Sequence, residues 1–225
     1  MISFFNMYSR SDTMMTHKRR HKYHVFNHDR HMVETTPRDM VESMCKTTEL
    51  HGTSIGYGTV SSGSCSFSQG FGSKSEGFGS VCLGKKGLAY NRHQVTHSAG
   101  CFDELGDCQN SSVILKIITN DKETKSMRND DVDFYFIHEN ICSAVQLKIM
   151  AVSDDMVISI LDKKCVIYKN SIHCIDESSY HTGEEKCDVN LSIKIKGMKY
   201  MDIEGIGIEG KLIKWVCYIN SLEIK

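Results

Sequence analysis

Five histidines near the N-terminus have a spacing that could support chemistry. They follow one another at intervals of four, three, four and three residues: His17, His21, His24, His28 and His31. On a helix this spacing would align the five rings along one stripe. In a parallel trimeric stem, such inward-facing imidazoles could bind an anion or a metal ion. Two other interpretations stay open, namely a solvated basic tail or stem, and an attachment segment held by an acidic partner or by nucleic acid in a capsid.

The ten cysteines are spread singly along the chain, and no two of them form a CxxC pair. Zinc sites usually need closely spaced pairs, because one turn must present two thiolates to the same ion. The N-terminal residues also lack the pattern of a signal peptide, so we expect reduced thiols that pack as small hydrophobic groups. The cysteines therefore predict neither a metal site nor a disulfide framework.

Candidate catalytic groups are few and isolated. Cys101 with His97 is the nearest approach to a nucleophile and its base, but no third group that would orient the base is evident. Adjacent acids, such as Asp154 and Asp155, are typical of solvated turns. From the residues alone we expect no catalytic residue, no bound cofactor and no enzyme activity.

The composition of the 225 residues indicates a folded chain. Hydrophobic residues make up 40% and charged residues 24%, which is enough apolar material for a packed core. The formal net charge of -1 gives no global attraction to nucleic acid, which we do not expect as a partner. The longest apolar runs are far shorter than the roughly 18 residues that would span a bilayer, so we expect no membrane insertion.

An internal repeat dominates the middle of the chain. Five glycines stand seven residues apart without a slip: Gly56, Gly63, Gly70, Gly77 and Gly84. Small residues recur at alternate positions between them, as one crowded face of a strand would require. We therefore predict a β-roll over residues 50–100, with two heptads per turn and an interior that admits only Ser, Gly, Ala or Cys. A flexible Gly/Ser linker is the alternative.

The blocks on either side of the repeat differ from it and from each other. Residues 101–225 contain short alternating segments rich in Val, Ile, Phe and Tyr, separated by polar turns. No long helical pattern interrupts them, so we predict an antiparallel β-sandwich-like domain. Residues 1–49 are predicted to form an N-terminal attachment segment, either a tail or a helical stem that Pro37 would end.

The stretch GFGSKSEGFGS resembles the head repeats of YadA-type trimeric adhesins, and the same repeats in phage and large-virus tail fibres. The resemblance continues to the end of the chain through a junction motif and a terminal strand, and it covers about residues 50–225. The matching residues of the junction motif are Gly100, Phe102, Gly106, Asp107 and Gln109, and those of the terminal strand are Trp215 and Glu223.

This resemblance implies an all-β homotrimer that serves as a structural virion component, a fibre- or spike-like protein for attachment or for capsid or tail decoration. It also implies a location in the virion after synthesis in the host cytoplasm. The expected partners are other copies of the chain, other virion proteins through residues 1–49, and a host-surface receptor or glycan. Two alternatives stay open: a self-processing intramolecular chaperone of a fibre protein, and a monomeric β-rich binding module.

Overall fold

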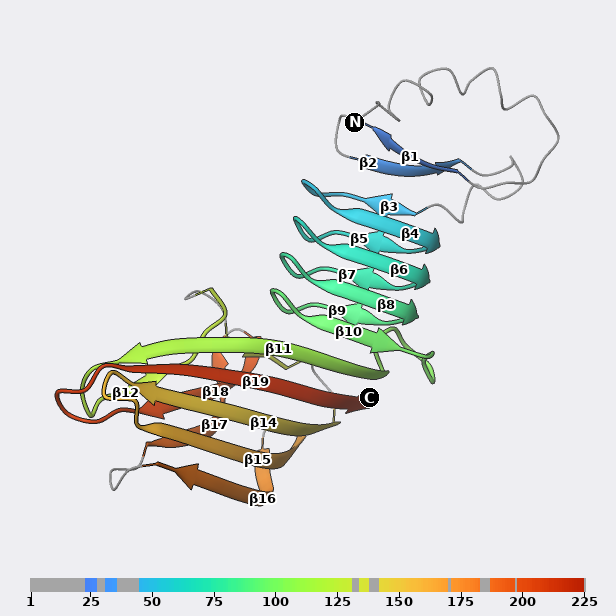
Figure 1. The fold of residues 1–225 in the computed structure, drawn as a ribbon. Helices are drawn as coiled ribbons and strands as arrows, with labels where there is room; N and C mark the ends of the chain where they lie inside the picture. Colours follow the sequence, from blue (N-terminus) through green and yellow to red (C-terminus); the bar gives the residue numbers. More distant parts are fainter. Residues whose placement is uncertain are drawn as a thin grey trace.

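The fold is described by a computed structural model for residues 23–27, 31–35, 45–130, 134–137, 142–169, 171–182, 187–196 and 198–224. All regular secondary structure in these residues is β-strand, which confirms the predicted all-β class. A narrow β-solenoid stands on a broader β-domain (Figure 1). The described part of the chain contains no helix with the length and apolar character needed to cross a membrane.

The solenoid repeats every 14 residues. Its longer strands are β4 (Thr53–Tyr57), β6 (Phe67–Phe71), β8 (Val81–Lys85) and β10 (Val95–Ser98), and its shorter ones are β3 (Lys46–Thr47), β5 (Val60–Ser61), β7 (Lys74–Ser75) and β9 (Leu88–Ala89). Each strand pairs in parallel with the strand one turn away, so that Thr53 lies opposite Phe67, and Phe67 opposite Val81. The prediction of two heptads per turn is therefore confirmed, in a β-solenoid of about four turns.

Small side chains fill the interior of the solenoid. Ser54, Ser61, Ser68, Ser75 and Cys82 are all fully buried on successive strands. Buried hydroxyls need partners, and here they find them within the same or the next turn. The Ser68 hydroxyl donates to the carbonyl of Ser73 at 2.9 Å, and the Ser75 hydroxyl donates to the carbonyl of Phe67 at 2.6 Å. The interpretation of this block as a flexible linker is therefore wrong.

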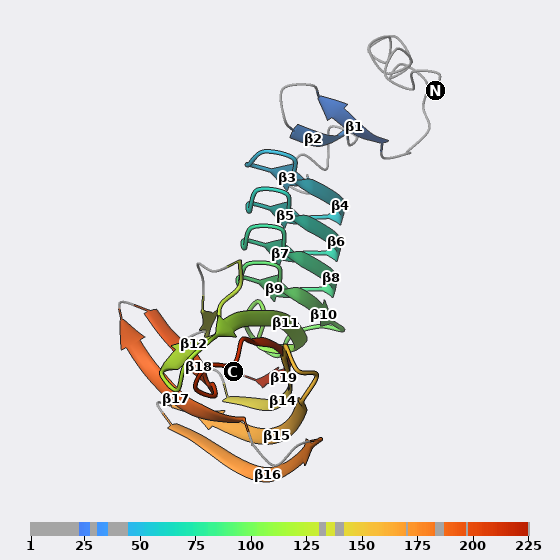
Figure 2. The same cartoon turned by 60° about the vertical axis from the view of Figure 1, so that its left-hand side comes forward.

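The β-domain is built on long antiparallel strands. Its first sheet contains β11 (Cys108–Thr119), β14 (Cys142–Ser153), β15 (Ile158–Tyr168), β16 (Ser171–His181) and β19 (Ile213–Ile224). The second sheet contains β12 (Thr124–Ser126), β13 (Tyr135–Phe136), β17 (Asp188–Lys196) and β18 (Met198–Ile206). Strand β10 of the solenoid pairs with β11, so one nine-stranded sheet runs in the order β16-β15-β14-β19-β11-β10-β8-β6-β4 through both parts of the molecule (Figure 2).

The hydrophobic core lies between the two sheets of the β-domain. Alternation along β11, β14, β15 and β19 sends every second side chain into it, including Leu147 and Trp215, and Met201 of β18 meets them from the second sheet. Trp215 packs over Gly205 of β18, where an added Cβ would lie 3.1 Å from the indole ring, and its Nε1 donates to the Thr119 hydroxyl at 2.9 Å. Trp215 therefore joins the two sheets at the far end of the domain from the solenoid.

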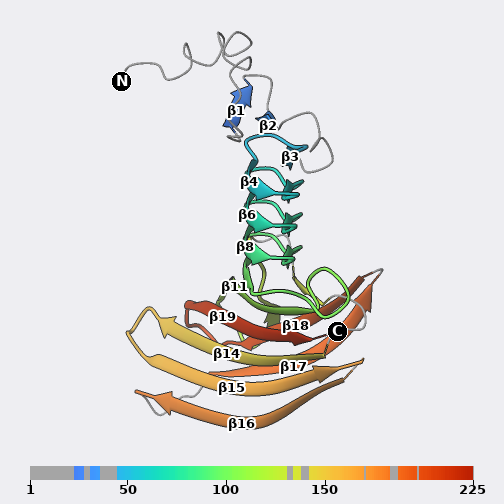
Figure 3. The same ribbon diagram turned by 90° about the vertical axis from the view of Figure 1, so that its right-hand side faces the viewer.

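The described residues of the N-terminal segment form strands, which contradicts the prediction of a helical stem there. Strands β1 (Tyr23–Asn27) and β2 (His31–Thr35) pair as an antiparallel hairpin beyond the first turn of the solenoid (Figure 3). His24 and His31 therefore lie on strands, and the stripe that a helix would have produced is not formed there. The short segments YHVFN and HMVET are rich in β-branched and aromatic residues, which favours strands over a helix. His17, His21 and His28 lie outside the described residues.

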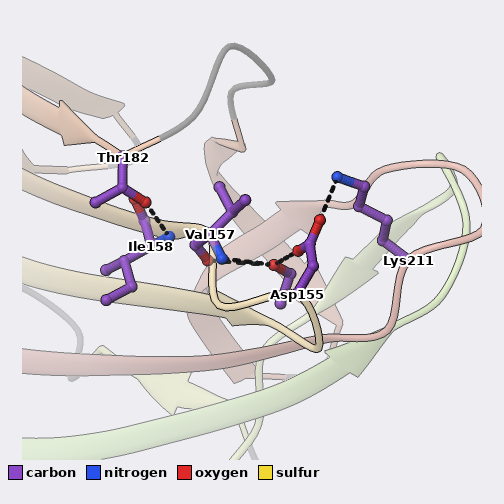
Figure 4. A network of polar contacts seen from close by, with 6 residues as sticks. Asp155, Val157, Ile158, Thr182 and Lys211 are labelled. Atoms are coloured by element: carbon purple, nitrogen blue, oxygen red, sulfur yellow. Dashed lines mark hydrogen bonds and ion pairs between the residues drawn. The ribbon is translucent and has the colours of Figure 1, made fainter.

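A polar network stabilises the turn between β14 and β15 (Figure 4). Asp155 accepts hydrogen bonds from the Lys211 ammonium group at 2.8 Å and from the Ser153 hydroxyl. The Ser153 hydroxyl in turn accepts from the backbone N–H of Val157 at 3.0 Å. The bonds from Lys211 and Ser153 lower the pKa of Asp155 to about 2.

Replacing Lys211 tests whether its ammonium group causes the low pKa of Asp155. In Lys211→Met, the pKa of Asp155 is expected to rise toward the usual value of about 3.9, measured by an NMR titration of its carboxyl carbon. Because the folded-state pKa is depressed, the contribution of this carboxylate to stability is present above about pH 4 and is lost as the pH falls toward 2. Lys214→Met on β19 is the matched control. A pKa that stays at about 2 in Lys211→Met would show that Ser153 alone causes the shift.

Candidate functional site at the junction

Gln109 joins the solenoid to the β-domain. Its side-chain oxygen accepts from the backbone N–H of Leu88 at 2.8 Å, and its Nε2 donates to the Leu88 carbonyl at 2.9 Å. The same Nε2 lies 2.9 Å from Oε2 of Glu223, on the last strand of the chain. One buried amide on β11 therefore fastens β9, in the last turn of the solenoid, to β19 of the β-domain.

Glu223 is a buried acid, with 1% of its surface exposed. Its Oε1 accepts from the Ser221 hydroxyl at 2.7 Å and from the Tyr135 hydroxyl at 3.4 Å, so both carboxyl oxygens have partners. Burial raises the pKa of Glu223 above its usual value, whereas the bonds from Ser221 and Gln109 lower it in part. Burial also raises the pKa of Tyr135, and the adjacent Glu223 carboxylate adds to that shift.

Asp107 organises the loop that enters β11. Its carboxylate accepts from the backbone N–H groups of Phe102, Asp103 and Glu104 at 2.7–2.9 Å, which is the geometry of a carboxylate cap on a tight loop. Gly106 follows the loop with φ of 80°, and an added Cβ there would lie 2.8 Å from the Cβ of Leu88. The loop therefore presses closely on the last turn of the solenoid.

The structure brings together only some of the residues identified from the sequence. Gln109 and Glu223 meet in one buried network, and Asp107 and Gly106 lie beside it. Phe102 projects into solvent with 67% of its surface exposed, and Gly100 has no heavy atom within 4 Å of an added Cβ. Trp215 lies opposite Ala151 and Ile117, well along the strands from Glu223.

The junction also contains residues that sequence reasoning missed. Asn91 occupies the position held by Gly63 and Gly77 in earlier turns, and its side chain exchanges two hydrogen bonds with the backbone of Phe136 at 2.8 and 3.1 Å. Gln94 is fully buried and donates to the Ser111 hydroxyl at 2.9 Å. The break in the glycine series at Asn91 was the available signal for this contact.

The face of the nine-stranded sheet that points away from the core carries exposed hydrophobic side chains beside lysines such as Lys116 and Lys148. We call it the outer face. Its exposed hydrophobic residues on the long strands include Ile114, Ile118, Met150, Ile160, Val216, Tyr218 and Leu222. Val216 lies opposite Met150, and Met150 lies opposite Ile160, so these side chains form a row across three strands. Such contiguous apolar surface is typical of an interaction site.

A groove of about 380 Å³ lies on the outer face where the solenoid meets the β-domain. Val95, Ile114 and Tyr218 line it together with the pair formed by His93 and Asp130. Nε2 of His93 lies 2.9 Å from Oδ2 of Asp130, and this hydrogen bond lowers the pKa of the Asp130 carboxyl. The described residues contain no group of three or more His, Cys, Asp or Glu side chains that could hold a metal ion.

Comparison with known proteins gives one distant similarity. No protein-family model and no curated protein sequence matches the chain. A solved structure that is similar to it is the tailspike protein gp49 from Acinetobacter baumannii bacteriophage Fri1, a capsular polysaccharide depolymerase. The sequence identity is 9% and the TM-score 0.25, and the match covers 72% of this chain and 39% of the tailspike.

This comparison contradicts the expectation that the chain has no enzyme activity. The similar tailspike is a polysaccharide depolymerase and hence an enzyme, so the expectation drawn from the scattered candidate catalytic residues is withdrawn.

Proposed function

We propose that the chain is a fibre- or spike-like structural component of a virion that assembles as a homotrimer. The observation that carries this proposal is the set of exposed hydrophobic side chains on the outer face, which belongs to one continuous sheet running from the β-domain onto the solenoid. Large exposed apolar patches are rare on monomeric proteins, because water contact with them is unfavourable. A solenoid that ends in a broad β-domain also suits a protein that projects from a particle.

Other copies of the same chain are the occupants that fit the outer face best. On the solenoid, this face repeats with every 14-residue turn, in the ladder Phe67, Val81 and Val95. A partner that matches such a ladder over its whole length needs the same repeat, which another copy of the chain supplies. Association through this face would cover the row formed by Ile160, Met150 and Val216.

Absolute mass in solution tests the trimer. Light scattering on the purified chain is expected to give about three times the chain mass of 25.5 kDa. A value of twice the chain mass would retain self-association but replace the trimer with a dimer. A value of one chain mass would overturn the assembly and favour the monomeric binding module.

Met150→Glu tests the outer face directly. Met150 is exposed and lies between Val216 and Ile160, so the chain should still fold, but assembly would bury a carboxylate among apolar side chains. Association is expected to weaken roughly a hundredfold, about 3 kcal/mol, measured by sedimentation at several concentrations. Asn190→Glu, at an exposed position of β17 in the other sheet, is the matched control. Unchanged association in Met150→Glu would place the interface elsewhere.

The same proposal includes attachment of the protein to the virion and to the host surface. Residues 1–49 would hold other virion proteins, and the surfaces that the trimer leaves open would contact a host-surface receptor or glycan. The adhesin-like head repeat supports this assignment through the resemblance of its heptads. Binding of the purified assembly to host cells, compared with binding of the Met150→Glu variant, measures whether attachment requires the assembled form.

A further inference from the structure

Two cysteines face each other across the edge of the first sheet. In the register of β15 and β16, Cys165 lies directly opposite Cys174. Directly opposed residues of antiparallel strands have Cα atoms about 4.5–5.5 Å apart and side chains on the same face. A disulfide spans Cα separations of about 4.4–6.8 Å, so the pairing meets the requirement without movement of the strands.

A β-bulge creates this pairing. The register shifts between Lys164 and Cys165: Lys164 lies opposite Asp176, whereas Cys165 lies opposite Cys174 and Ile175 is the extra residue. The ion pair between Lys164 and Asp176, at 2.7 Å, supports the register on one side of the bulge. Without the extra residue, Cys165 would face Ile175 and the thiols would not meet.

The two thiols touch but differ in their access to solvent. Cys165 is 1% exposed and belongs to the core-facing side of β15, whereas Cys174 is exposed on the edge strand. Burial raises the pKa of the Cys165 thiol to about 12, and its hydrogen bond with the Cys174 thiol adds to the shift. Because Cys174 lies on the core-facing side of the sheet, assembly through the outer face leaves it accessible.

We propose that Cys165 and Cys174 form a cross-strand disulfide when the protein meets an oxidising thiol–disulfide couple such as glutathione. The exposed Cys174 sulfur attacks glutathione disulfide, which forms a mixed disulfide and releases one reduced glutathione with the Cys174 proton. The Cys165 sulfur then attacks the Cys174 sulfur and releases a second reduced glutathione with its own proton. The two thiols are oxidised to one disulfide, and one glutathione disulfide is reduced to two glutathione molecules.

The disulfide would fix the edge strand β16 to its neighbour β15. Strand β16 ends the order of the nine-stranded sheet, and Ile175 and Tyr180 on it are largely exposed. Edge strands with exposed apolar residues are prone to separate or to pair with other chains. The disulfide would hold β16 on β15 after the protein leaves a reducing compartment, and hydrogen exchange of β16 amides would slow roughly tenfold to a hundredfold.

Peptide mapping tests the disulfide on the full chain. The protein is equilibrated in buffers of defined reduced and oxidised glutathione, its remaining thiols are alkylated, and it is digested with trypsin without reduction. Cleavage after Lys164, Lys169 and Lys186 separates the two cysteines into the peptides 165–169 and 170–186. We expect these peptides as one disulfide-linked species in oxidising buffer and as two alkylated peptides in reducing buffer.

Two cysteine variants and one internal comparator serve as controls for the disulfide-linked species. Cys174→Ser changes an exposed side chain, and Cys165→Ala keeps a small apolar group in the core, so either variant should fold and lose the linked species. The exposed Cys65 on the solenoid is an internal comparator that should only be alkylated or glutathionylated. A mixed disulfide of Cys174 with Cys165 still alkylated would overturn the proposal, and so would a linkage of Cys174 to another chain.

Discussion

Gly70→Ala is expected to lower the free energy of unfolding by roughly 3–5 kcal/mol. Gly70 has φ of 123°, which side chains rarely adopt, and its added Cβ would lie 1.9 Å from the carbonyl oxygen of Gly84 in the next turn. That oxygen accepts the hydroxyl of Ser73 at 2.8 Å, so displacing it also disturbs an interior hydrogen bond. Urea unfolding at one fixed protein concentration measures the loss, because the proposed self-association would couple stability to concentration.

Gly72→Ala is the matched control for this prediction. Gly72 has φ of 63°, and the atom nearest to an added Cβ is Cγ of Lys86 at 3.5 Å. Lys86 itself occupies the equivalent position one turn later with φ of 54°, so this conformation accepts a side chain. We expect a loss of about 1 kcal/mol. Equal losses in the two variants would show that close packing of successive turns does not explain the glycine at position 70.

Gln109→Met is expected to destabilise the junction by about 3–5 kcal/mol, although the side chain keeps its length and volume. The substitution removes the partners of the Leu88 N–H, the Leu88 carbonyl and one carboxyl oxygen of Glu223. Each polar group left buried without a partner costs about 1–3 kcal/mol. Denaturant unfolding measures the total, and hydrogen exchange at Leu88 reports whether the last turn separates from the β-domain.

Asn110→Met on the same strand is the control for Gln109→Met. Asn110 is exposed on the outer face beside Leu222, so its loss should change stability by less than about 0.5 kcal/mol. If Gln109→Met proves as mild as Asn110→Met, the solenoid is held on the β-domain mainly by strand pairing between β10 and β11 and by the contacts of Asn91 and Gln94.

The sequence was sufficient to predict the solenoid. Spacing of Gly63, Gly70 and Gly77 is a local property, and the size of the residues between them limits what the interior can contain. Each turn contacts mainly its neighbours, so a repeat of fixed length and fixed pattern specifies one geometry. The alternating pattern of the long strands likewise predicted an antiparallel β-domain, because alternation reports which face is buried.

The N-terminal histidines show where local spacing misleads. Intervals of three and four residues fit a helix, but the segments around His24 and His31 pair as a hairpin. Pairing of two strands rich in β-branched and aromatic residues outweighed the helical spacing of one residue type. A periodicity carried by a single residue type is therefore weaker evidence than one carried by the whole hydrophobic pattern.

Only the tertiary structure decided which distant residues meet. Gln109 and Glu223 are separated by 114 positions, and the contact of Cys165 with Cys174 depends on one extra residue in a bulge. Register and sheet order arise from the summed pairing of many residues, and a shift of one residue exchanges the two faces of a strand. The chain itself determined the repeat, the strands and the small interior. The continuous sheet, the buried junction and the opposed thiols exist because the long strands pair in one register.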